Sequence, residues 1–172
     1  ETGVVLIDDL LSGGCMQSMM WTVSLILCAL TFGGILETTG MLNAIAQSIL
    51  KLAVNTGLLV TATILSCFTV NLITGEQYLS IVIPGRMFKD AYADRGLAPV
   101  NLSRALEDSG TITSPLIPWN TCGAFMTATL GISPLAYAPY AFLNIINPFV
   151  SIFYGFTGIT MIKMTEEEKA AY

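Results

Sequence analysis

Three long stretches of this sequence carry no charged side chain, and they constrain its fold more than any other feature. The charge-free runs are residues 10–36 with 27 positions, 52–75 with 24 and 109–162 with 54. About 20 apolar residues let an α-helix cross a bilayer, so the third run is long enough for two crossings. Only 11% of the 172 residues are charged, against about 25% in a soluble domain. The sequence predicts an all-α, polytopic helical membrane protein.

The composition also excludes several classes of function. The chain has no histidine, which excludes His-based catalytic triads and His metal sites. It has no Gly-x-Ser-x-Gly motif and no Cys-x-x-Cys pair, and its basic residues form no patch typical of nucleic-acid binding. We therefore expect no enzyme, no resident cofactor and no nucleic-acid partner. The cysteines are expected to be small buried hydrophobic residues; they are Cys15, Cys28, Cys67 and Cys122.

The apolar runs divide into predicted helices. Residues 16–36 predict a spanning helix, and residues 134–163 predict a last spanning helix that bends near Pro148. Residues 41–54 place apolar side chains three or four positions apart, which is typical of an amphipathic helix at the interface or inside the protein.

A second long apolar segment, residues 57–84, is interrupted by NLITGEQY at 71–78. Glu76 ends an uncharged run there, and Asn71 adds a side-chain oxygen. Glu76 is either an ion- or proton-binding carboxylate or an acid at the cytoplasmic interface, and the residues leave both interpretations open.

Basic residues indicate the orientation of the chain. They gather in a predicted polar connector at residues 85–100 and just after it, at Arg86, Lys89, Arg95 and Arg104. Because cytoplasmic loops are rich in Lys and Arg, this connector is predicted to be cytoplasmic. Residues 101–132 then cross outward and the last helix returns, which places the tail at 164–172 in the cytoplasm. Residues 1–14 are predicted to form a loop.

The most informative stretch is LEDSGTITSPLIPWNTCGAF, residues 106–125. Asn101 or Ser103 is the predicted N-cap of the helix that leads into it. Pro115 and Pro118 have no N–H and disfavour helix just before themselves, so residues 110–119 are predicted to be unwound. Each unpaired backbone group in a bilayer costs several kcal/mol. Such a break persists only where protein or water satisfies it, as an ion site does.

Oxygen-bearing side chains are dense in this stretch. They are Asp108, Ser109, Thr111, Thr113, Ser114, Asn120 and Thr121. Carbonyls and hydroxyls are the ligands that a hard cation prefers. Desolvation raises the pKa of a carboxyl group and a bound cation lowers it, so one carboxylate can exchange a proton for a cation.

Two structural alternatives remain open for the same stretch. Glu107 and Asp108 follow Arg104 by three and four residues, the spacing of ordinary ion pairs on a helix. The prolines alone can also produce a kink that binds nothing.

Four segments together carry a resemblance to a known family. They are TFGGILETTGML (31–42), NLITGEQYLSIVIPGRMF (71–88), NLSRALEDSGTITSPLIPWNTCGAFM (101–126) and YAPYAFLNIINP (137–148). They resemble the C-terminal part of NhaC-type sodium/proton antiporters, members of the wider ion transporter superfamily. The resemblance covers nearly the whole chain, and its third motif is the most specific.

The resemblance implies a fold of two repeats with opposite topology, each with a hairpin and a broken helix, of which residues 1–172 are about the second half. It implies a multi-pass protein of a prokaryotic cell (inner) membrane that exchanges Na⁺ for H⁺ by alternating access, with no other cofactor. The implied partners are the lipid bilayer, Na⁺ and H⁺, and a missing N-terminal half; a homodimer is a further candidate.

The resemblance also points to individual positions. The implied ion- or substrate-binding residues are Asn71, Glu76, Asp108, Ser109, Thr111, Ser114 and Asn120. Thr121 is a further candidate because of the oxygen density of the stretch. Of these, Asp108, Thr111 and Asn120 are the hypothetical Na⁺ ligands.

Two other functions stay in competition with Na⁺/H⁺ exchange. In sodium- or proton-coupled exchange of organic acids such as malate and lactate, the half-helix that starts near Trp119 and the charge of Arg104 would face a carboxylate. In a non-transporting structural subunit of a membrane assembly, the polar residues would pair only with one another.

Overall fold

A computed structural model describes residues 15–51 and 53–165. Their regular structure is helical, with one isolated bridge between Leu97 and Lys163, which confirms the all-α expectation. The α-helices are α2 (Cys15–Thr38), α3 (Met41–Leu50), α4 (Thr56–Thr74), α5 (Gln77–Ala93), α6 (Pro99–Leu106), α7 (Thr121–Leu130), α8 (Pro134–Tyr137) and α9 (Phe142–Thr157). A π-helix, η1 (Glu107–Thr111), and two 3₁₀ turns, η2 (Ser114–Leu116) and η3 (Ala138–Tyr140), complete the set. The predicted loop at 1–14 and residues 166–172 of the predicted tail lie outside the described residues.

Within the described residues, two helices are long and apolar enough to cross a membrane, Met20–Thr38 and Thr56–Thr74. The pair Pro134–Tyr140 and Phe142–Thr157 passes the same test as one span bent by 61°. These segments confirm a membrane protein and match the apolar runs of the sequence.

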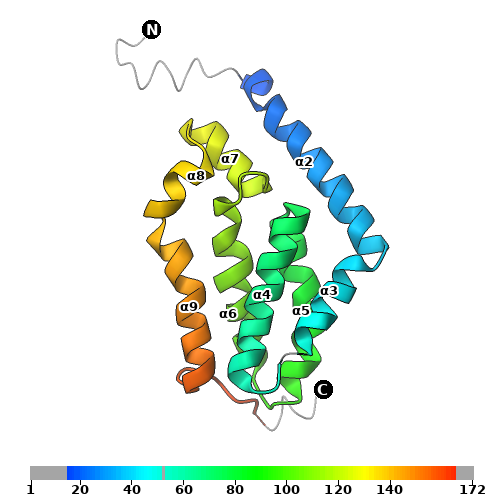
Figure 1. The fold of residues 1–172 in the computed structure, drawn as a ribbon, viewed down its shortest axis with the longest axis vertical. Helices are drawn as coiled ribbons and strands as arrows, with labels where there is room; N and C mark the ends of the chain where they lie inside the picture. Colours follow the sequence, from blue (N-terminus) through cyan, green and yellow to red (C-terminus); the bar gives the residue numbers. More distant parts are fainter. Residues whose placement is uncertain (1–14, 52, 166–172) are drawn as a thin grey trace.

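Helices α4 and α5 form an antiparallel hairpin (Figure 1). The turn is only two residues long, because Gly75 ends α4 in the left-handed conformation at φ 64° and Glu76 caps α5. Near the opposite end of the hairpin, the hydroxyls of Thr63 and Tyr92 lie 3.2 Å apart. The interruption at 71–78 therefore reverses the chain.

Helix α5 continues to Ala93, so residues 85–93 are helical and do not belong to the connector expected at 85–100. The reason is an amphipathic pattern inside the charged segment, where Phe88 and Tyr92 are one turn apart and both fully buried. The connector proper is the short link before α6.

The stretch expected to be unwound is helical for longer than its prolines suggested. Helix α6 begins with Pro99 at its first position and Ala98 as N-cap, so neither Asn101 nor Ser103 caps it. It continues through η1 and η2 and ends at Leu116, where Ile117 becomes extended, four residues before Asn120, the N-cap of α7. The break is therefore shorter than residues 110–119.

The last span bends at Ala141, where the backbone leaves the helical region at φ −82°, ψ 59°, and Pro148 lies inside α9. The helix ends at Thr157, six residues before the predicted limit of 163. Helix α9 packs closely on α4: a Cβ atom at Gly155 would lie 2.9 Å from Val60 Cβ. Small residues permit such close approach between membrane helices.

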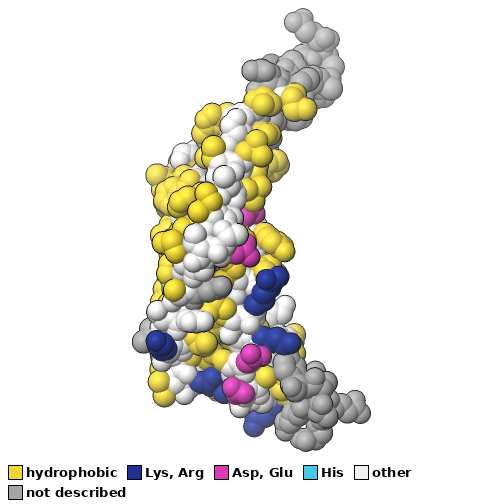
Figure 2. All heavy atoms as spheres, turned by 90° about the vertical axis from the view of Figure 1, so that its right-hand side faces the viewer, with side chains coloured by type: hydrophobic (Ala, Val, Ile, Leu, Met, Phe, Trp, Pro, Cys, Tyr) yellow, Lys and Arg dark blue, Asp and Glu magenta, His cyan; other side chains and the backbone are white. Residues whose placement is uncertain are grey.

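The core lies where α4, α5 and α6 meet, and α2 and α3 cover the other side of the hairpin (Figure 1). In Figure 2, Lys and Arg side chains gather at the lower end of the molecule, whereas hydrophobic side chains dominate the face above them. This is the distribution expected of a protein with one end in the aqueous phase and its body in a bilayer.

Candidate functional site

Pro115 frees backbone carbonyls that a regular helix would satisfy, because it has no N–H to offer to residues three to five positions earlier. Side chains take over this role. The carbonyl of Gly110 accepts from Asn71 Nδ2 at 2.9 Å, that of Thr111 from Ser114 Oγ at 2.9 Å, and that of Ile112 from Asn144 Nδ2 at 2.6 Å. Side chains of α4, of the interrupted helix itself and of α9 thus satisfy the freed carbonyls. A membrane interior requires this, because it offers no water to unpaired backbone groups.

Two predicted residues, Asn71 and Asn120, meet at the centre of this region. Asn120 Nδ2 donates to Asn71 Oδ1 at 2.6 Å, and both side chains are fully buried. Asn120 Oδ1 accepts the N–H of Cys122 and so caps α7. Thr113 adjoins the pair, with its hydroxyl 3.4 Å from Asn71 Nδ2. The start of α7 is further tied to the hairpin tip, since Thr121 N–H donates to the Gly75 carbonyl at 3.0 Å.

A pocket of about 320 Å³ lies where α5 and α7 both begin, and its surface is mostly apolar. Three predicted residues line it: Thr111, Ser114 and Thr121. Gln77 Oε1 accepts from Cys122 Sγ at 2.8 Å and from Ser114 Oγ at 3.3 Å. The first residues of both helices therefore line one pocket, in which a few hydroxyl and amide groups adjoin a mostly apolar surface.

The Asp108 side chain points toward α9. Its Oδ1 accepts from Asn147 Nδ2 at 2.8 Å. In the part of the chain that the structure describes, the ion pairs weighed for Glu107 and Asp108 do not form, because Arg104 donates to both the hydroxyl and the carbonyl of Thr160 at 2.8 Å. Arg104 therefore ties α6 to the segment after α9.

The remaining predicted residues have local partners. Ser109 is buried and its hydroxyl donates to the Ala105 carbonyl at 2.6 Å. The Thr111 hydroxyl donates to Glu107 Oε2, and Glu76 is half-buried as the N-cap of α5. The three hypothetical Na⁺ ligands, Asp108, Thr111 and Asn120, thus have three different hydrogen-bond partners.

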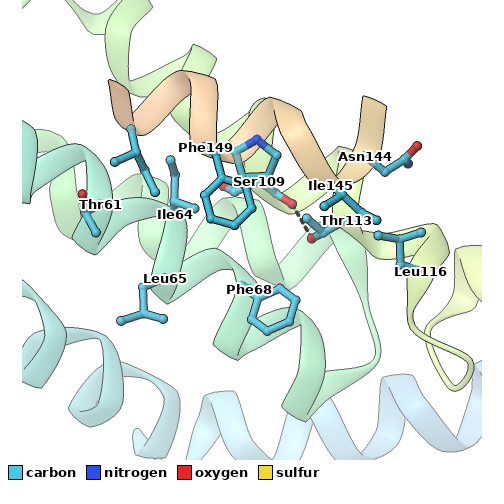
Figure 3. A pocket seen from close by; sticks show the side chains of 12 residues that line it. Thr61, Ile64, Leu65, Phe68, Ser109, Thr113, Leu116, Asn144, Ile145 and Phe149 are labelled. Carbon is cyan, nitrogen blue, oxygen red and sulfur yellow. Dashed lines mark hydrogen bonds between the residues drawn. The ribbon is translucent and has the colours of Figure 1, made fainter. Parts of the chain in front are cut away.

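A second pocket, of about 360 Å³, separates α4 from α9 and is almost entirely apolar (Figure 3). Phe68 and Ile64 line it from α4, and Phe149 and Ile145 from α9. Ser109 and Thr113 form its polar edge and are joined by a hydrogen bond from the Thr113 hydroxyl to the Ser109 carbonyl. This pocket contacts the π-helical turn at Ser109, whereas the pocket at the beginnings of α5 and α7 contacts it at Thr111.

Sequence reasoning missed four side chains that the site uses: Gln77, Cys122, Asn144 and Asn147. Thr113 was among the oxygen-bearing side chains of the stretch but not among the predicted binding residues. Gln77 lies in a quoted motif, but nothing in the sequence indicates that the chain reverses just before it. A signal for the last pair was present, because Asn144 and Asn147 are two amides one helical turn apart in an uncharged run.

The described residues hold no group of three or more Cys, Asp or Glu side chains suited to a metal ion. The oxygen atoms at the crossing of α4 with the α6–α7 segment belong to amides, hydroxyls and carbonyls. The sequence matches the Na⁺/H⁺ antiporter family over residues 1–159.

The chain belongs to the Na⁺/H⁺ antiporter family. The Na⁺/H⁺ antiporter NhaC of Alkalihalophilus pseudofirmus is 45% identical over 92% of the chain and 34% of its own length. The arginine/ornithine antiporter ArcD of Halobacterium salinarum is 41% identical over 98% of the chain and 35% of its length. The malate-2H⁺/Na⁺-lactate antiporter of Bacillus subtilis is 31% identical over 92% of the chain and 34% of its length.

The chain spans about a third of the length of these relatives. No solved structure matches it. Family membership therefore rests on the sequence, and the fold described above adds the positions of its polar residues.

Proposed function

We propose that this chain forms part of a secondary transporter that exchanges Na⁺ for H⁺ across a prokaryotic cell membrane by alternating access. One observation carries the proposal: a hairpin and an interrupted helix cross inside the protein with buried amides and freed carbonyls. Interrupted apolar helices are the best structural pointer to a transporter's ion site. The family match and the NhaC relatives support the same activity.

Na⁺ binds, in this proposal, where the two elements cross. The amide oxygens of Asn71 and Asn120 and the Thr113 hydroxyl are hard ligands of the type that such a cation prefers. In the structure these atoms satisfy one another. When Na⁺ enters, these atoms exchange their hydrogen bonds with one another for coordination to the ion. Because they are paired when no ion is bound, the free-energy cost of an empty site inside the bilayer is limited.

Asp108 supplies the exchangeable proton. It lies two residues before Gly110, whose carbonyl is bonded to Asn71. A negative charge at this place attracts Na⁺ into the crossing, and protonation removes that attraction. The binding of Na⁺ and the binding of the proton therefore oppose each other, and the π-helical turn η1 links the two positions. Such turns are frequent at functional sites.

Two further observations, the lengths of the relatives and the basic end of the molecule, extend the proposal to the rest of the transporter and to its orientation in the membrane. A further segment of the transporter, about twice as long as this chain, completes the site. The end at which Lys and Arg side chains gather faces the cytoplasm, and so does the segment after α9, in which Lys163 bridges back to Leu97.

Proton flux in everted vesicles tests the function. The full-length protein that contains this sequence is expressed, and a pH-sensitive dye reports proton movement after a pulse of Na⁺ with no organic acid present. The wild type is expected to respond and D108N to lose the response. The neighbouring variant E107Q is the matched control and is expected to keep it. A wild type without Na⁺-driven flux would disprove the antiport, and an active D108N would disprove the role of Asp108.

A second candidate function is exchange of organic acids, which the pocket at the beginnings of α5 and α7 favours. Malate, lactate and the amino acids handled by two of the relatives all bear a carboxylate. The beginnings of α5 and α7 place partial positive charge beside Gln77 and Ser114. Arg104, the cation considered for this role, is bonded to Thr160 instead. Proton flux that appears only after malate, lactate or arginine is added would favour this function over Na⁺/H⁺ exchange.

A further inference from the structure

The indole of Trp119 bonds to the end of α4 next to the proposed Na⁺ site. Its Nε1 donates to the Leu72 carbonyl at 2.8 Å, and Leu72 directly follows Asn71 in α4. Trp119 directly precedes Asn120, so the indole bond and the 2.6 Å contact between the two amides join adjacent pairs of residues. We propose that Trp119 is a positioning residue, whose indole N–H holds the Asn120 amide against Asn71 and so pre-organises the site for Na⁺.

The Leu72 carbonyl accepts this bond because α4 ends before the residue that would satisfy it. In a continuing helix the carbonyl would accept the N–H of Glu76. Gly75 instead turns the chain in the left-handed conformation at φ 64°, and the Glu76 N–H donates to Thr74 Oγ1 at 3.2 Å. The Trp119 indole therefore supplies the donor that the end of the helix lacks.

The backbone on both sides of Asn120 is fixed against the same turn. The Trp119 carbonyl lies so close to Gly75 that a Cβ atom there would be 2.9 Å from the carbonyl oxygen. On the other side, the Thr121 N–H donates to the Gly75 carbonyl at 3.0 Å. A substitution of Trp119 can therefore remove the indole bond while these two backbone contacts remain.

The chemistry of the indole separates positioning from ion binding. Its N–H is a donor only, so the nitrogen of Trp119 cannot coordinate a cation. Its effect on Na⁺ has to pass through Asn120. Without the bond, the chain before Asn120 gains freedom that Na⁺ binding must remove, and a less pre-organised site binds its ligand more weakly. Loss of the N–H is therefore expected to raise the Na⁺ concentration that transport requires.

The test rests on the proposed function and compares variants of the full-length protein in everted vesicles. Na⁺-driven proton flux is measured over a series of Na⁺ concentrations, which separates the half-saturating concentration from the maximal flux. W119F keeps an aromatic ring and loses the N–H. We expect it to raise the half-saturating Na⁺ concentration about fivefold, the scale of one neutral hydrogen bond, with little change in maximal flux. W21F is the matched control, because Trp21 is exposed on α2, and it should keep the wild-type value.

A second pair of variants disturbs the same contact from the hairpin. G75A adds a Cβ atom 2.9 Å from the Trp119 carbonyl oxygen and so displaces Trp119 together with its indole. G131A is its control, because Gly131 ends α7 at φ 70°, close to the 64° of Gly75, while a Cβ there meets nothing within 4 Å. Both changes strain a left-handed residue, so only G75A is expected to raise the half-saturating Na⁺ concentration.

The assignment of Trp119 would be overturned by a W119F variant with the half-saturating Na⁺ concentration of the wild type. This holds even if its maximal flux falls, since a tryptophan with a purely structural role predicts that pattern. Equal effects of G75A and G131A would overturn it too, and this comparison decides the question if W119F does not reach the membrane. A wild type without Na⁺-driven flux would instead refute the proposed function.

Discussion

Asn120 Nδ2 lies 2.6 Å from Asn71 Oδ1, and this contact joins the start of α7 to the last full turn of α4. Each amide also serves the backbone. Asn71 Nδ2 donates to the Gly110 carbonyl, and Asn120 Oδ1 accepts the N–H of Cys122. One pair of side chains therefore holds together the hairpin, the π-helical turn and the second half of the interrupted helix.

Removal of one member of this pair should destabilise the protein. In N120A, Asn71 Oδ1 and the Cys122 N–H lose their partner inside the bilayer, at a cost of about 1–2 kcal/mol. The thermal unfolding of N71A, N120A and the double variant in detergent measures this cost. The double variant is expected to be less destabilised than the sum of the two single variants. Strict additivity would mean that the two amides do not interact in the folded protein.

Pro115 should be more important for transport than for stability. In P115A the new N–H can pair with a carbonyl of the π-helical turn and compete with Asn71 or Ser114. Exchange is expected to fall by roughly tenfold or more, while the unfolding temperature stays the same or rises. P99A is the control, because Pro99 occupies the first position of α6, where an N–H has no helical partner. Equal activity of P115A and P99A would contradict a role for the break.

The contact between α4 and α9 requires a glycine. In G155A, the added methyl group would meet Val60 Cβ at 2.9 Å, and relief of this overlap is expected to cost about 1–3 kcal/mol. G34A is the control: a Cβ there meets nothing within 4 Å, so this change in α2 should be neutral or stabilising by up to about 1 kcal/mol. Both are measured by thermal unfolding in detergent, and equal stability of the two variants would argue against the close packing.

The orientation of the chain can be measured by cysteine labelling. On a background without native cysteines, D94C lies in the connector between α5 and α6 and S133C lies between α7 and α8. A membrane-impermeant maleimide is expected to label D94C in everted vesicles and S133C in right-side-out vesicles. The reverse pattern would place the basic end of the molecule outside the cell.

Much of the architecture followed from the sequence. The charge-free runs led to helices α2, α4 and α9. The two prolines located the interruption before α7, because a residue without an N–H leaves a carbonyl of the preceding turn without its helical partner. The spacing of Phe88 and Tyr92 shows why the charged segment after Pro84 is helical, although its charges suggested a connector.

The partners of the polar residues depended on the tertiary structure. A pattern along the chain shows which side chains share a helix face, but the register between helices comes from the close packing of distant segments. The reversal at Gly75 brings Asn71 to Asn120, and the approach of α9 at Gly155 brings Asn147 to Asp108. The sequence by itself therefore determined a helical membrane protein with oxygen-rich interruptions, and only the fold decided which oxygens meet and which carboxylate has an amide beside it.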